Sequence, residues 1–413
     1  MNEHFLSEYP GTHIEMEVKT CDFEDNDQLP VKVEEAIRKI VKKEGYTNHK
    51  QTSKAISTDG GNYLGSLYEV NVTGYTEVGK KETNIFVKGI IPGDLLSVLS
   101  VTEIFNTEVF FYNDLAVVFD ELQNEANVPA KERYNIVNSF QESIPEAIIL
   151  ENLSKKGYKT GFRMDVISLK FAELTVQQLG RLHGLSFALE NKKPNYFNRK
   201  IKSLSVPYKF NEDFKGLITI SGKRISECLD DDVRERFTAF LEKLWHDVQR
   251  YYSDQTYKRT IVHCDYRANN ILMKEIDGEI IDVVPVDYQF IHYGCPVTDF
   301  LYFIFLGTDQ EFRKNHLEHL KDLYFDSVTK MLKYFNIDVK SVFPRKDFED
   351  LYTELLGFGL FSFVQIMPFI FAVEGEIPEL GKDQLDGESI KCDERMKGRA
   401  RGIVDDFIRW GVM

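Results

Sequence analysis

A run of short apolar segments, each ending in an acid or an amide, constrains this chain more than any other feature. Residues 261–273 read IVHCDYRANNILM, so an apolar strand end leads to Asp265, and Asn270 precedes the next apolar strand. One hairpin later, residues 284–290 read VPVDYQF and place Asp287 at the end of another strand. Short strands joined by hairpins form a small sheet, and we expect the three polar residues to leave its strands on the same side.

Converging carboxylate and amide oxygens suit Mg²⁺, a hard ion that also binds substrate phosphates. A further Asp accepts the proton of an attacking hydroxyl, and phosphoryl transfer requires this combination. The spacing H-x-D-x-x-x-x-N with a later Asp is that of a kinase catalytic loop. Asp and Asn after strands are often only turn formers, but the ordered set favours function. His263 is expected to hold the loop by hydrogen bonds rather than to transfer protons.

The rest of the chain reads as a small strand-rich lobe followed by a larger helical lobe. Residues 1–29 are polar and acidic and predict a loosely held extension, which leaves 30–152 and 153–413 for the two lobes. The apolar periodicity predicts a helix from Pro30 to Gly45, strands at 50–57, 62–76, 83–91 and 147–150, and helices within 94–121. Beyond residue 168 the pattern is mostly helical, with short strands near 260, 271–274 and 280–286.

Composition excludes several classes of protein. The net charge of −15 over 413 residues repels phosphate backbones, so nucleic acid is not an expected partner. Five scattered cysteines without a C-x-x-C pair predict reduced thiols in a cytoplasmic protein with no zinc site. No signal peptide is visible. The apolar stretch from Leu355 to Val373 contains Gln365 and Pro368, which favours a buried core helix over a membrane span.

Three motifs resemble the ecdysteroid kinase-like family, within the choline kinase and aminoglycoside phosphotransferase branch. They are His263-Cys-Asp-Tyr-Arg-Ala-Asn-Asn270, Val286-Asp-Tyr-Gln-Phe290 and Tyr293-Gly-Cys-Pro-Val-Thr-Asp-Phe-Leu-Tyr302. The resemblance extends from about residue 35 to the C-terminus and is weaker in the N-terminal part. It implies an α+β, bilobal protein-kinase-like fold with a small antiparallel-sheet lobe and a larger, mostly helical lobe.

The resemblance also implies roles for single residues. Asp265 is expected to be the catalytic base, and Asn270 and Asp287 to hold Mg²⁺. Asp299 is expected to brace the catalytic loop, and His183, in a large-lobe helix, to be structural.

In the small lobe, Lys88 and Glu108 are expected to form the ion pair that positions ATP. The turn at Gly60, Gly61 and Asn62 is expected to cover the phosphates through its N–H groups, although a plain hairpin explains it almost as well. The connector at Glu151 and Leu153 is expected to meet the adenine.

Four positions depart from the family pattern. Cys264 stands where Gly is more frequent, and Tyr288 replaces the usual Phe. Tyr266 and Arg267 replace an apolar residue and a Trp beside the base, on the side expected to face the acceptor. None of these changes removes a catalytic group.

The prediction is therefore an ATP- and Mg²⁺-dependent phosphotransferase acting on a hydroxyl of a small lipophilic molecule, an ecdysteroid or a xenobiotic alcohol. Aromatic residues of 355–373 are candidates for lining the acceptor pocket, with core packing as the alternative. Two other functions stay open: a kinase for choline or ethanolamine, and a non-catalytic protein that binds a small ligand. A monomer is expected.

Overall fold

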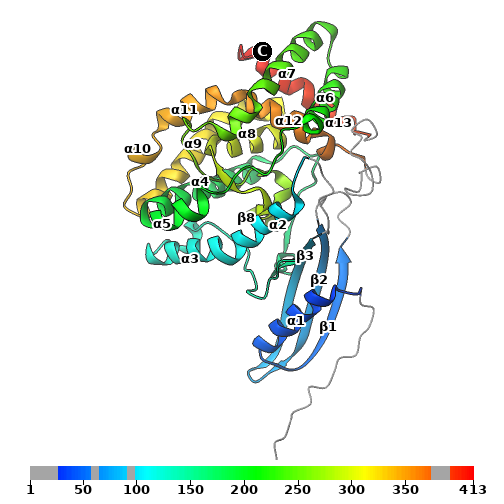
Figure 1. The fold of residues 1–413 in the computed structure, drawn as a ribbon, viewed down its shortest axis with the longest axis vertical. Helices are drawn as coiled ribbons and strands as arrows, with labels where there is room; N and C mark the ends of the chain where they lie inside the picture. Colours follow the sequence, from blue (N-terminus) through cyan, green and yellow to red (C-terminus); the bar gives the residue numbers. More distant parts are fainter. Residues whose placement is uncertain (1–26, 57–64, 91–97, 374–390) are drawn as a thin grey trace, which may run out of the picture.

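The computed structural model describes residues 27–56, 65–90, 98–373 and 391–413, and it shows two lobes of different composition (Figure 1). The small lobe holds an antiparallel sheet in the order β1-β2-β3-β4, with α1 lying along its long strands. Its strands and helices are α1 (Val31–Lys43), β1 (Tyr46–Ile56), β2 (Gly65–Thr76), β3 (Gly79–Ile90), α2 (Val101–Phe110), the π-helical turn η1 (Phe111–Leu115), α3 (Ala116–Glu125) and β4 (Ala147–Glu151).

The large lobe is mostly helical and contains two small antiparallel sheets, β5-β7-β8 and β6-β9. Its strands are β5 (Tyr158–Lys159), β6 (Thr260–Val262), β7 (Ile271–Ile276), β8 (Glu279–Pro285) and β9 (His292–Gly294). Its helices are α4 (Leu169–Lys192), α5 (Pro194–Tyr196), α6 (Glu212–Glu227), α7 (Asp231–Ser253), α8 (Pro296–Gly307), α9 (Gln310–Tyr334), α10 (Val339–Val342), α11 (Arg345–Glu354), α12 (Leu356–Ile370) and α13 (Arg395–Arg409).

Alternation along β3 explains why a lysine of this strand faces the cleft between the lobes. Ile85 and Val87 are buried against α1 in the core of the small lobe. Since successive residues of a strand point to opposite faces, Phe86 and Lys88 lie on the other face. Both of them line the cavity described below.

The helices that follow β3 share the core of the large lobe. Ile104 and Phe105 of α2, Phe111 of η1 and Phe119 of α3 are buried in the same hydrophobic cluster as the large-lobe helices, whereas α1 and the opposite sheet face form a separate cluster. Helix α2 also contacts the turn Tyr288–Phe290 (η6) that follows Asp287. This packing ties the position of α2, and of any side chain on it, to the end of β8.

Two glycines let α4 and α9 approach closely. A Cβ at Gly180 would lie 2.6 Å from the carbonyl oxygen of Tyr324, and one at Gly184 would lie 2.8 Å from the Cβ of Met331. Such distances are shorter than any real Cβ contact, so larger residues would separate the helices. The contact fixes the position of His183, which α4 carries and whose Nε2 lies 3.2 Å from Oδ2 of Asp299.

The apolar stretch that raised the membrane question is the core helix α12. Phe358, Phe361 and Phe363 are at most 2% exposed, so these aromatic side chains pack in the core. Among the described residues no single helix has the length and apolar character to cross a membrane; α11 and α12, bent by 53°, satisfy that test only as a pair.

The expected elements are present with shifted ends. Strand β1 begins at Tyr46 rather than at 50, because Tyr46 still pairs with Thr76 of β2. The helices expected within 94–121 begin at Val101 and continue to Glu125. Positive φ angles of 53° and 83° form the turn at Asp277 and Gly278. Residues 1–26 of the predicted N-terminal extension, and residues 57, 62–64, 91 and 94–97 of the other predictions, lie outside the described residues.

Candidate active site

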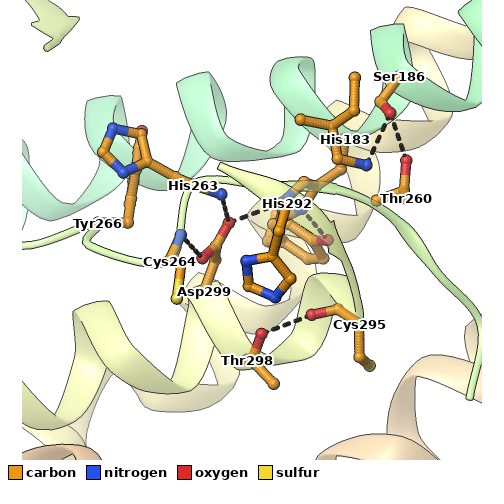
Figure 2. A network of polar contacts seen from close by, with 12 residues as sticks. His183, Ser186, Thr260, His263, Cys264, Tyr266, His292, Cys295, Thr298 and Asp299 are labelled. Carbon is orange, nitrogen blue, oxygen red and sulfur yellow. Dashed lines mark hydrogen bonds and ion pairs between the residues drawn. The ribbon is translucent and has the colours of Figure 1, made fainter. Parts of the chain in front are cut away.

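The loop after β6 is held by one buried carboxylate. Asp299, on the first turns of α8, accepts hydrogen bonds from the backbone N–H of His263 at 2.6 Å and of Cys264 at 2.8 Å (Figure 2). Cys264 has a φ of 64°, a region that L-residues adopt at a cost of about 1–2 kcal/mol. This angle explains why Gly is frequent there in the family, and the small Cys side chain is accommodated.

His183 and His263 fix the loop from two sides. His183 Nε2 lies 3.2 Å from Asp299 Oδ2, and its Nδ1 lies 2.7 Å from the hydroxyl of Tyr324. Burial raises the pKa of Asp299, but the contacts with His183 and His263 outweigh burial and lower it, so the carboxylate stays charged. His263 Nε2 lies 3.1 Å from the carbonyl oxygen of Val286, and burial lowers the pKa of this imidazole. A buried, neutral His263 holds the loop next to β8, as expected from the sequence.

Three side chains surround the carboxylate of Asp265. Asn270 donates through Nδ2 to Asp265 Oδ2 at 2.7 Å, and the Tyr302 hydroxyl donates to Oδ1 at 2.7 Å. Arg267 Nε lies 3.1 Å from Oδ1 and forms an ion pair with it. Asp265 is 4% exposed, so the structure holds this carboxylate in one position at the edge of the interior.

Lys88 brings the small lobe to the second acid. Its Nζ donates at 2.7 Å both to Glu108 Oε2 on α2 and to Asp287 Oδ1. Burial lowers the pKa of Lys88, but the charges of Asp287 and Glu108 outweigh burial and raise it, so the ammonium stays charged. Burial raises the pKa of Glu108 against the opposing effect of Lys88. Gln289 also reaches this group, with Oε1 3.5 Å from Lys88 Nζ.

An aromatic stack joins η1, which continues α2, to the turn after Asp287. The ring of Tyr288 stacks on Phe111 with an interplanar angle of 10°, and its hydroxyl lies 2.7 Å from the hydroxyl of Tyr134. The Tyr288 hydroxyl also donates to the carbonyl oxygen of Pro285 at 3.2 Å. The family's usual Phe has no hydroxyl for these bonds, so the departure at this position adds buried polar contacts that fix the turn.

A cavity of about 700 Å³ opens between the lobes at these residues. Its walls come from β2, β3, β4, the connector and the loop between β6 and β7, and they combine apolar side chains with a few charged ones. The lining includes Leu67, Phe86, Lys88, Glu108, Leu150, Glu151, Leu153, Phe162, Arg163, Asn270, Leu272, Val286 and Asp287. Its volume and mixed lining are typical of a cofactor or nucleotide site.

The donor set at the inner end of the cavity fits Mg²⁺. Asn270 forms its two hydrogen bonds to Asp265 through Nδ2, which leaves its carbonyl oxygen as the possible ligand, and Asp287 supplies carboxylate oxygens. Mg²⁺ is usually held by one or two such groups together with waters and phosphates. Within the described ranges, no three His, Cys, Asp or Glu side chains are arranged around one metal position.

The structure therefore brings together most of the residues that the sequence singled out. Lys88, Glu108, Asn270, Asp287 and the connector line one cavity, and Asp265 lies directly behind Asn270. The predicted turn at Gly60, Gly61 and Asn62 lies outside the described residues. The N–H of Glu151 already donates to the carbonyl of Asn138 at 2.9 Å, so it is not a donor to an adenine.

One contact at the site was not expected. Tyr302 is the last residue of the third family motif, and no role for it was expected from the sequence. It follows Asp299 by three positions on α8, and residues three apart share a helix face. That spacing was the available signal.

The chain matches one known protein family over most of its length. The family model described as the ecdysteroid kinase-like family matches residues 59–337. No curated protein matches the chain significantly. Among solved structures, the chain is similar to a Plasmodium vivax ethanolamine kinase, with 12% identity, a TM-score of 0.39, and 87% of this chain and 83% of that chain covered. It is also similar to the GDP complex of an aminoglycoside 2'-phosphotransferase, with 11% identity, a TM-score of 0.41, and 93% of this chain and 100% of that chain covered.

Both TM-scores are below 0.5, so the assignment rests on the family match and on the observed lobes. The four-stranded antiparallel small lobe, the helical large lobe and the cavity between them form the bilobal protein-kinase-like fold. The family model spans more than half of the chain. The chain belongs to the ecdysteroid kinase-like family.

Proposed function

We propose that this protein transfers the γ-phosphoryl group of ATP to a hydroxyl of a small, uncharged, lipophilic molecule. The observation that carries the proposal is the pairing of Lys88 with both Glu108 and Asp287 at 2.7 Å, beside a fixed Asp265. Phosphoryl transfer depends on positioning and charge neutralisation. A buried lysine next to a metal-binding acid supplies both, because the lysine binds the ATP phosphates and the acid holds the metal ion that neutralises their charge.

In this proposal ATP occupies the cavity between the lobes. The adenine lies against Leu67, Leu150 and Leu272, and its edge meets the connector at Glu151 and Leu153. Lys88 binds the phosphates, and its ion pair with Glu108 fixes its position. The lobe boundary after residue 152 belongs to the same proposal, since β4 ends at Glu151.

Asn270 and Asp287 hold Mg²⁺, which would supply charge neutralisation of the phosphates. Asp265 accepts the proton of the acceptor hydroxyl while that oxygen forms its bond to the γ-phosphorus. The bond between the γ-phosphorus and the β–γ bridging oxygen breaks, and ADP leaves. Asn270 and Arg267 keep the Asp265 carboxylate oriented during this step.

The surroundings of Asp265 favour an acceptor without positive charge. Arg267 places a guanidinium against the base, and a nearby ammonium group would be repelled by it. Tyr208 lies near enough to Cys264 and Asp265 to interact with them electrostatically, and its ring stacks on Phe290 with centroids 5.6 Å apart and contacts Tyr252. Aromatic rings bind a steroid or another lipophilic alcohol and can equally bind a quaternary ammonium group, so the preference for a neutral acceptor rests on the charge of Arg267.

The test is phosphate transfer from Mg-ATP to a panel of acceptors, measured by mass spectrometry. The panel contains ecdysteroids and plant phenolic glycosides as neutral acceptors, and choline and ethanolamine as cationic ones. Asp265→Asn should lower the rate of product formation by about 10²- to 10⁴-fold, the usual effect of removing a general base. ATP binding, measured by calorimetry, should be retained in this variant.

Each outcome decides between functions. Full activity of Asp265→Asn would contradict the role of the base. Preference for choline or ethanolamine would favour the other kinase reaction. ATP or ligand binding without any Asp265-dependent phosphate transfer, including transfer to water, would favour a non-catalytic binding protein.

A further inference from the structure

Tyr302 touches the group that we propose as the general base, although it lies on a helix far from the catalytic loop in sequence. Its hydroxyl donates to Asp265 Oδ1 at 2.7 Å, and the two residues are 37 positions apart. Tyr302 is 2% exposed and Asp265 is 4% exposed, so water does not replace this bond readily. A hydrogen bond to a buried carboxylate is stronger than one between neutral groups.

Tyr302 also keeps its proton. Burial and the neighbouring charge of Asp265 raise its pKa well above that of an ordinary tyrosine. The hydroxyl is therefore a donor, and Asp265 is its acceptor. Together with Asn270 on Oδ2, it gives each oxygen of the carboxylate one short hydrogen bond. With both oxygens held, the carboxylate cannot rotate about its terminal bond without breaking one of them.

A single helix carries this contact and the contact that shapes the loop. Asp299 and Tyr302 are one turn apart on α8, so they face the same side of the helix. Asp299 fixes the backbone N–H groups of His263 and Cys264, and Tyr302 fixes the side chain of the next residue, Asp265. Helix α8 is buried over its whole length, which makes it a rigid support.

We propose that Tyr302 is a positioning residue of the phosphotransferase: its hydroxyl holds Oδ1 of Asp265 so that the carboxylate faces the acceptor hydroxyl. The inference rests on the proposed function. Tyr302 acts through Asp265 and is not among the described residues that line the nucleotide cavity. Its loss should therefore affect the chemical step and leave nucleotide binding unchanged.

The variant that tests this is Tyr302→Phe, which removes one oxygen atom and keeps the ring. Losing a hydrogen bond to a charged group should lower kcat by about 10- to 100-fold, while the Kd for ATP stays within twofold of the parent value. Tyr257→Phe is the matched control. Tyr257 is also buried and donates to a carboxylate, Glu354 Oε1, at 3.0 Å, but it lies outside the site.

A double-mutant cycle separates positioning from a general effect on structure. In the Asp265→Asn background, Tyr302→Phe should cause no further loss of rate, because the group through which it acts is gone. The cycle is measured with the best acceptor of the panel, and in parallel with water as acceptor by release of inorganic phosphate from ATP. Thermal unfolding of every variant accompanies the rates.

The outcomes distinguish the two proposals. Wild-type protein without any Asp265-dependent transfer, to water or to an added acceptor, overturns the proposed function and this inference with it. Active protein in which Tyr302→Phe keeps at least half of kcat overturns this inference alone. An equal loss of kcat in Tyr257→Phe also overturns it. The same holds if Tyr302→Phe lowers kcat as much in the Asp265→Asn background as in the parent protein.

Discussion

Replacing Asp299 by Asn tests whether this carboxylate braces the catalytic loop. Asp299 is 1% exposed, and its two oxygens receive the N–H groups of His263 and Cys264 and lie beside His183. Asn offers one acceptor oxygen and turns an NH₂ group toward a backbone N–H. Breaking such a buried, charged network costs about 3–5 kcal/mol.

The expected thermal shift follows from the size of the chain. With about 2.1 cal/mol/K of unfolding entropy per residue, 413 residues give about 0.9 kcal/mol/K. A loss of 4 kcal/mol therefore lowers Tm by about 4–5 °C. Without the Asp299 carboxylate, the backbone of Cys264 is no longer held at its positive φ, so the loop can shift. A displacement of about 1 Å at Asp265 lowers kcat by about 10²-fold.

Differential scanning fluorimetry and steady-state kinetics measure the two effects. Asp309→Asn serves as the control, because Asp309 caps α9 by accepting from the N–H of Phe312 at 2.8 Å, and Asn is an equally good N-cap. If Asp299→Asn stays within 1 °C of the parent Tm and within twofold of its kcat, the carboxylate does not brace the loop and the reasoning is refuted.

Three further predictions concern neighbouring residues. Burial lowers the pKa of His292 to about 4, whereas in the unfolded chain this imidazole takes up its proton near pH 6.5. The free energy of unfolding should therefore fall by about 3 kcal/mol in total as the pH drops from 6.5 toward 4. Urea titrations of His292→Asn should show a weaker dependence on pH. Cys264→Val should destabilise the protein by about 2 kcal/mol more than Cys264→Ala, because a β-branched residue resists a φ of 64°; equal unfolding midpoints would count against this. Arg267→Glu should raise the ratio of kcat/KM for cationic over neutral acceptors at least about tenfold, and an unchanged ratio would show that Arg267 does not select the acceptor.

The local pattern of apolar and polar residues predicted the helices and strands that are specified by residues close together in the sequence. Alternation along 83–91 placed Lys88 in a strand, and the apolar run of 355–373 predicted the buried helix α12. The ends of elements were less predictable: β1 starts four residues earlier than expected because its first residue pairs with Thr76, a partner 30 positions away. The helices after β3 could not be assigned to a core from their sequence, and they pack with the large lobe.

The sequence by itself determined which residue types lie at the ends of these short strands, because the order and spacing of Asp265 after β6, Asn270 before β7 and Asp287 after β8 are local properties. Tertiary structure alone decided how these residues are held. Lys88 reaches Asp287 across 199 positions, Tyr302 reaches Asp265 across 37, and Asp299 reaches Cys264 across 35. The physical reason is that a hydrogen bond or ion pair depends on side-chain positions within a few tenths of an ångström, and these positions are set by the packing of α8, α2 and β3 around the loop.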